Sequence, residues 1–85
     1  MALIVDIVAP DRTLWTGEAS FVSAPSVEGS IGMYQGHEPL LSVLGPGRVR
    51  VVETGGEDRI VEIVGGFLSF DHDSVTIVAE PVEAA

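Results

Sequence analysis

The sequence predicts an all-β protein, a small antiparallel β-sandwich of short strands. Turn-forming residues recur at intervals of roughly 8–12 residues, a spacing typical of sandwiches and barrels. The segments between them are rich in Val, Ile, Thr and Phe, which pack better on a pleated sheet than in a helix. The length of 85 residues provides one hydrophobic core and no second. We expect one domain over residues 1–80 and a short C-terminal tail over residues 81–85.

The first and last strand-like segments alternate most clearly between apolar and polar residues. Leu3, Val5 and Ile7 fall on one side of the first segment, and Asp6 falls on the other. In the last segment the odd-numbered residues of 75–79 are apolar, whereas residues 74 and 76 are Ser and Thr. Both segments are therefore predicted to be strands with one face in water.

The middle of the chain predicts a hairpin. Residues 54–58, Thr-Gly-Gly-Glu-Asp, separate two strand-like segments at residues 48–53 and 59–64. A glycine-rich phosphate-binding loop requires a helix after it, and no helical pattern follows here. Residues 59–64 are apolar on both faces, so this strand is expected either between two layers or beneath a partner.

Charge and composition exclude several classes of function. The chain has 13 acidic residues against four arginines, for a formal net charge of -9, which disfavours nucleic acid and anionic membrane surfaces as partners. The absence of cysteine removes disulfides and zinc-thiolate sites. The N-terminus leads directly into strand-like sequence without a basic or long apolar run, so we predict a cytosolic chain without membrane insertion.

His37 beside Glu38 is the most enzyme-like pair, because a histidine with a carboxylate can act as a general base, with Ser42 or Ser30 as nucleophile. Adjacent strand residues point to opposite faces, however. Residues 29–32 also lack the strand-to-helix context of a nucleophile elbow. The sequence therefore favours a turn histidine, and no catalytic residue is predicted.

The triplet Asp71-His72-Asp73 offers oxygen and nitrogen ligands, but three consecutive residues in a tight turn rarely converge on one metal ion. We predict a solvated turn, with no metal or cofactor site. Several large side chains lie beside predicted turns, where they either enter the core or form an exposed interface. These side chains are Trp15, Met33, Tyr34, Leu40 and Leu41.

Residues 28–41, Glu-Gly-Ser-Ile-Gly-Met-Tyr-Gln-Gly-His-Glu-Pro-Leu-Leu, closely resemble the signature of F-type ATP synthase epsilon subunits. Further matches follow the family's order over residues 5–11, 17–19, 47–50, 65–67 and 75–80, so that the resemblance covers almost the whole chain. Glycines in this signature let the chain turn repeatedly, and Pro39 stiffens its exit. Gln35 stands where the family usually has proline, which implies a less rigid loop.

The resemblance implies the β-sandwich domain of a non-catalytic central-stalk subunit that couples proton flow to ATP synthesis. Such a subunit docks on the gamma subunit and on the polar loops of the c-ring, and rotates with both, at the cytoplasmic face of the bacterial plasma membrane. The implied gamma contacts are Ala9, His37 and Ser42, and the implied c-ring contacts are Glu28 and Ser30. No cofactor is implied.

Epsilon subunits commonly continue into a pair of helices that inhibit ATP hydrolysis. The sequence ends at Ala85, so we expect it to couple rotation without inhibiting hydrolysis or sensing nucleotide. Two other functions remain open. One is a free-standing module that binds carbohydrate or peptide on a concave aromatic surface, although the five aromatic residues are widely spread. The other is a small hydrolase using His37, which requires a pocket and an oriented carboxylate.

Overall fold

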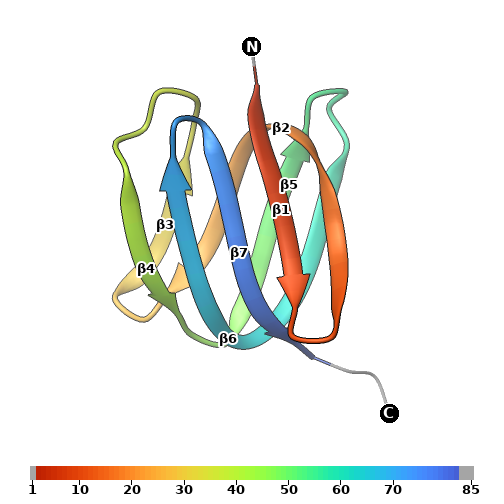
Figure 1. Ribbon diagram of the computed structural model, residues 1–85, viewed down its shortest axis with the longest axis vertical. Helices are drawn as coiled ribbons and strands as arrows, with labels where there is room; N and C mark the ends of the chain where they lie inside the picture. The colour runs from red at the N-terminus through yellow and green to blue at the C-terminus, as the bar shows by residue number, and fades with distance from the viewer. Residues whose placement is uncertain (1, 83–85) are drawn as a thin grey trace.

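The computed structural model describes residues 2–82, which form seven β-strands and, within that range, no helix (Figure 1). The strands are β1 (Leu3–Ala9), β2 (Arg12–Ser26), β3 (Gly29–Met33), β4 (Leu40–Leu44), β5 (Gly47–Glu53), β6 (Asp58–Asp71) and β7 (Ser74–Pro81). The predicted all-β class is confirmed, as is the hairpin between β5 and β6. Of the tail expected over residues 81–85, Pro81 ends β7 and residues 83–85 lie outside the described range.

The strands form two layers joined by two long strands (Figure 1). The first sheet contains β1, β7, residues 65–71 of β6, and β4. The second sheet contains β3, residues 19–26 of β2, β5, and residues 58–63 of β6. β1 pairs antiparallel with β2 and parallel with β7, which closes one side of the sandwich. The sequence predicted an antiparallel sandwich, and the parallel pairing of β1 with β7 is a feature that it did not predict.

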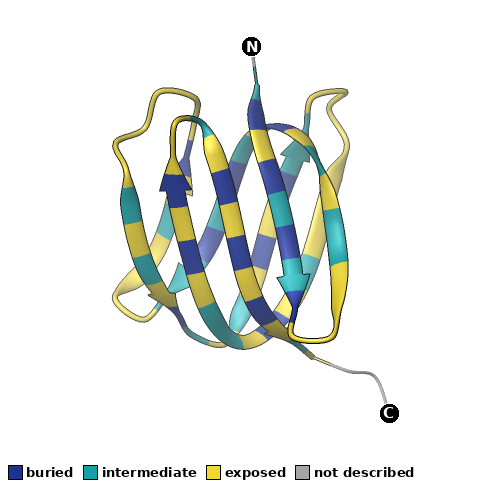
Figure 2. Cartoon of the chain, viewed as in Figure 1, coloured by how far each residue is buried: buried dark blue, intermediate teal, exposed yellow. Residues whose placement is uncertain are grey.

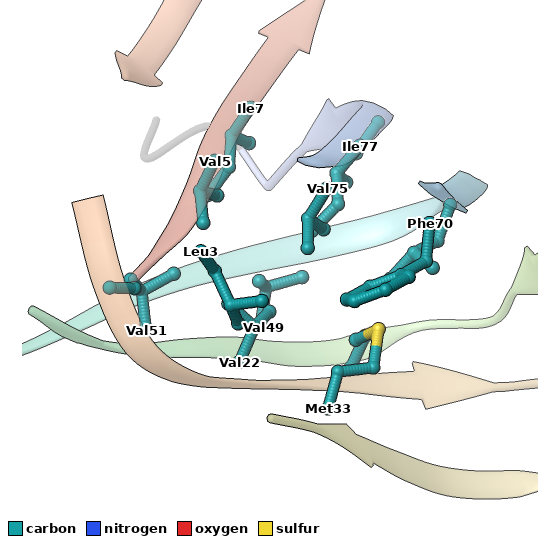
Figure 3. Packing of buried hydrophobic residues seen from close by; sticks show 14 of the residues in the cluster. Leu3, Val5, Ile7, Val22, Met33, Val49, Val51, Phe70, Val75 and Ile77 are labelled. Atoms are coloured by element: carbon teal, nitrogen blue, oxygen red, sulfur yellow. The ribbon is translucent and has the colours of Figure 1, made fainter. Parts of the chain in front are cut away.

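The core lies between the sheets, and most of its residues alternate with outward-facing ones along their strands. Buried and exposed residues alternate along residues 67–71 of β6 and along β7 (Figure 2), and the predicted inward positions of β1 and β7 are confirmed. Side chains from both layers meet in the middle, as Figure 3 shows for Phe70 and Ile77 facing Met33 and Val49. The described residues bury no charged or polar side chain, so the packing between the two sheets is hydrophobic.

Gly65 and Gly66 mark where β6 passes from the second sheet to the first. The register with β7 shifts between Ile63 and Gly65, as in a β-bulge, which bends the strand. At Gly66 an added Cβ atom would lie 2.2 Å from the carbonyl oxygen of Val78 and 2.7 Å from the Cα atom of Ala79. Only glycine fits there, because the neighbouring atoms belong to the backbone of β7.

The large side chains near turns divide between core and surface. Met33 is fully buried, and Trp15 and Leu40 pack half-buried against the core. Tyr34 and Leu41 are exposed instead. The segment 59–64 divides in the same way, with Ile63 in the core and the side chains of residues 60 and 64 outside. Large apolar side chains therefore remain on the surface of the free chain.

Candidate interaction surface

An apolar belt crosses the outer face of the first sheet. The strand register places Val43 of β4 opposite Phe67 of β6, Phe67 opposite Val78 of β7, and Val78 beside Val8 of β1. Phe67 is 57% exposed, Val43 49% and Val78 44%, whereas Val8 is half-buried. Leu41, at 78%, extends the belt at the β4 edge. A contiguous apolar surface of this kind is typical of a protein interface.

Carboxylates border this apolar belt. Asp6, Asp71 and Glu80 alternate with buried residues on their strands and therefore point to the same outer face. Asp6 accepts a hydrogen bond from the hydroxyl of Thr16 at 2.6 Å. No arginine occurs in β1, β4, β7 or residues 65–71. The face is therefore apolar at its centre and negative at its border.

The outer face of the second sheet balances its own charges. Arg48 lies 3.5 Å from Glu62, and Arg50 lies 2.9 Å from Asp58, both across the β5–β6 pair. Arg59 pairs with Glu53 at 2.9 Å, but Arg59 lies opposite the buried Val51 with its guanidinium over Trp15, so this pair is not on the outer face. A surface whose charges are already paired has less to offer a charged partner. The two faces thus differ in how their charges are paired.

Replacing Arg50 with alanine is expected to lower the free energy of unfolding by about 1 kcal/mol or less. Its ion pair with Asp58 is half-exposed on both sides, and solvent screens such pairs strongly. Urea denaturation monitored by circular dichroism measures the change. A loss several times larger would show that this pair stabilises the fold.

The aromatic side chains are dispersed over the molecule. Tyr34 is exposed and its ring lies 4.7 Å from that of Phe21. Trp15 packs half-buried under the guanidinium of Arg59, 5.5 Å away, and the remaining two phenylalanines lie in the core and in the apolar belt. This distribution gives little support to a module that binds carbohydrate on a concave aromatic surface.

His37 lies on the exposed loop 34–39 between β3 and β4. Its amide donates to the carbonyl of Tyr34 at 3.2 Å, and its ring Nδ1 lies 2.7 Å from the backbone carbonyl oxygen of Glu38. The ring also meets the edge of Phe70, with 5.3 Å between ring centres. The ring is thus engaged by main chain and an aromatic side chain, which is not the geometry of a general base. The described surface has an open hollow, but His37 does not line it. Its lining residues are Pro10, Asp11, Arg12, Glu80 and Pro81.

The expected gamma contacts are not part of the apolar belt. Ala9 ends β1 directly after Val8, and Ser42 lies on β4 directly before Val43, so both side chains point to the inner face, opposite the belt. Ala9 is buried and Ser42 is half-buried, its hydroxyl 3.2 Å from that of Ser26. His37 precedes β4 at the other end of the sheet from Ala9 (Figure 1).

The expected c-ring contacts lie together at one end of the sandwich. Glu28 is in the turn between β2 and β3, and Ser30 is the second residue of β3; both are exposed. The amide of Glu28 donates to the hydroxyl of Ser26 at 3.2 Å, which restrains the turn. In Figure 1 this turn lies at the same end as the β1–β2 turn and opposite the loop of His37.

The sequence profile of the family described as "ATP synthase, Delta/Epsilon chain, beta-sandwich domain" matches residues 2–85. The chain belongs to this family. The ATP synthase epsilon chain of Micrococcus luteus is 49% identical over 77 residues, covering 91% of this chain and 85% of the relative. That of Frankia casuarinae is 41% identical over 80 residues, covering 94% of both. The epsilon chain of Nocardia farcinica is 48% identical over 82 residues, but the match covers only 63% of it.

Solved structures agree with the family. A chain in the mitochondrial ATP synthase OSCP/F1/c-ring structure of Euglena gracilis superimposes with a TM-score of 0.88 and 26% identity, covering 95% of this chain and 52% of that one. A chain in the central stalk/c-ring structure of Tetrahymena thermophila ATP synthase gives a TM-score of 0.76 at 17% identity, which shows the shared fold alone. It covers 94% of this chain and 64% of that one.

The resemblance to epsilon subunits is therefore confirmed, and with it the non-catalytic character of the chain. The hydrolase hypothesis for His37 is wrong. Within residues 2–82 no group of three potential ligands is placed to hold a metal ion. Nor do those residues include a helix long and apolar enough to cross a membrane.

Proposed function

We propose that this chain is a central-stalk subunit of a proton-translocating F-type ATP synthase. It docks on the gamma subunit and on the polar loops of the c-ring and rotates with both, which couples proton flow to ATP synthesis at the cytoplasmic face of the bacterial plasma membrane. The relatives named epsilon chain support this proposal, as does the Euglena chain, which belongs to an OSCP/F1/c-ring assembly in a defined rotational state.

The apolar belt is the observation that carries the gamma contact. Its exposed side chains would remain in water without a partner. Burying such side chains drives association, at roughly 25 cal/mol per Å² of apolar area removed from water. The bordering carboxylates add orientation and association rate more than affinity. We therefore place gamma against the outer face of the first sheet.

The c-ring contact follows from the position of the β2–β3 turn. Glu28 and Ser30 are exposed at an end of the sandwich, so they stay accessible when a partner covers the outer face of the first sheet. A carboxylate and a hydroxyl suit a polar loop with basic or amide side chains. The two partners would then bind at the same time without competing.

Replacing His37 with alanine is expected to weaken gamma binding by about tenfold, as for one contact at the edge of an interface. The residue is exposed, so the melting temperature should change little. Calorimetric titration and thermal unfolding measure the two quantities. The control is Gln35→Ala in the same exposed loop. A large fall in melting temperature with unchanged binding would assign His37 to the fold instead.

Reconstitution tests the proposed function as a whole. Adding the chain to an ATP synthase depleted of its own epsilon subunit should restore ATP-driven proton pumping. Failure to restore pumping, together with failure to join the complex, would favour a free-standing binding module. The expectation that residues 1–85 alone do not inhibit hydrolysis stays a prediction. ATP-sensitive inhibition in the same assay would contradict it.

A further inference from the structure

The turn between β6 and β7 contains two residues in an unfavourable conformation. His72 has φ 50° and Asp73 has φ 61°, so the backbone of both residues is in the left-handed region. A two-residue hairpin turn of this kind favours Asn-Gly, because glycine adopts positive φ without steric cost. Strain retained at a defined position points to a use for the side chain that bears it.

Asp73 ties three separate segments together. Its carboxylate accepts a hydrogen bond from the amide of Gly36 at 2.7 Å, across 37 positions in the sequence. Its backbone carbonyl accepts a hydrogen bond from the amide of Ile4, at the start of β1, at 2.9 Å. Glycine at position 73 would relieve the strain but would remove the carboxylate that reaches Gly36.

Gly36 is the point at which the loop 34–39 needs an external restraint. It has φ +87° and would meet nothing within 4 Å if it carried a Cβ atom, so packing does not restrict it. The ring of the next residue, His37, contacts the ring of Phe70, the penultimate residue of β6, which leads into the β6–β7 turn. The hairpin therefore contacts both Gly36 and His37.

We propose that Asp73 is a positioning residue that fixes the loop 34–39, and His37 with it, for docking. This inference rests on the proposed function, since it assumes that His37 faces gamma. A charge-assisted bond to a backbone amide is among the stronger hydrogen bonds in proteins. A loop held this way loses less conformational entropy on binding, which raises affinity without adding a contact.

Three variants separate this role from a contribution to folding. Asp73→Gly keeps the backbone conformation of the turn and deletes the acceptor. Asp73→Asn keeps an acceptor oxygen and tolerates positive φ. His72→Gly relieves strain at the neighbouring position and leaves the bond intact. Amide exchange at Gly36 by NMR, melting temperature, and titration with the gamma subunit are measured for each.

Asp73→Gly should leave the melting temperature unchanged or higher, accelerate exchange at Gly36 by about tenfold, and weaken gamma binding by about tenfold. Asp73→Asn should keep amide exchange at Gly36 and gamma binding close to the wild-type values. His72→Gly should change neither of these two quantities. Unchanged exchange in Asp73→Gly would overturn the restraint. Fast exchange with full affinity would overturn the docking role, and a large fall in melting temperature would assign Asp73 to folding. If the wild-type chain itself fails to bind gamma, the docking role falls with the proposed function, while the exchange data still decide the restraint.

Discussion

Replacing Gly66 with alanine is expected to destabilise the domain by about 3 kcal/mol or more, at or above the upper range for an overpacked core. The added methyl group would lie 2.2 Å from the carbonyl oxygen of Val78, deep inside van der Waals contact. That oxygen belongs to the backbone of β7, which is held by pairing with both β1 and β6 and cannot move alone. Relief would require separating β6 from β7 where β6 changes sheets.

Urea denaturation of Gly66→Ala beside Gly55→Ala measures this effect. Gly55 lies in the exposed β5–β6 turn, and a Cβ atom there would meet nothing within 4 Å. The control should therefore unfold close to the wild-type midpoint. Equal stability of the two variants would show that β7 yields at Gly66, and that the close approach of the strands is not required by the fold.

Replacing Phe67 with serine is expected to weaken gamma binding by about 30-fold or more, the loss typical of a central aromatic contact. Phe67 lies in the middle of the apolar belt, between Val43 and Val78. Its side chain is 57% exposed in the free chain, so truncation should cost the fold little.

The matched control is Ile60→Ser. The exposed fraction of Ile60, 53%, is close to that of Phe67. Ile60, however, lies on the outer face of the second sheet, beside Arg50. Calorimetric titration of both variants into gamma compares the two faces directly. Loss of binding in Ile60→Ser with full binding in Phe67→Ser would move the docking face to the second sheet.

The faces of the individual strands could be predicted because alternation is local. Leu3 and Val5 alternate with more polar or exposed neighbours in the sequence, and their side chains point inward in the structure. The glycine-rich hairpin 54–58 follows from its own turn residues. The parallel pairing of β1 with β7 could not be predicted. It joins segments about seventy positions apart, and no residue pattern in either segment indicates which strand it pairs with.

The candidate site shows the same division. The exposed loop of His37 could be predicted from its glycines and proline. The apolar belt could not, because Val43, Phe67 and Val78 become neighbours only through the register of three strands. Their outward positions were the available signal, since each alternates with a buried residue. The hydrogen bond from Gly36 to Asp73 likewise depends on how two loops meet.

Calorimetric titration of this chain into the purified cognate gamma subunit at moderate salt tests the central claim most directly. We expect one-to-one binding with a dissociation constant of micromolar or tighter, which corresponds to about -8 kcal/mol or better. Absence of both heat and complex at roughly hundredfold higher concentration, with the chain folded, would contradict direct docking on gamma.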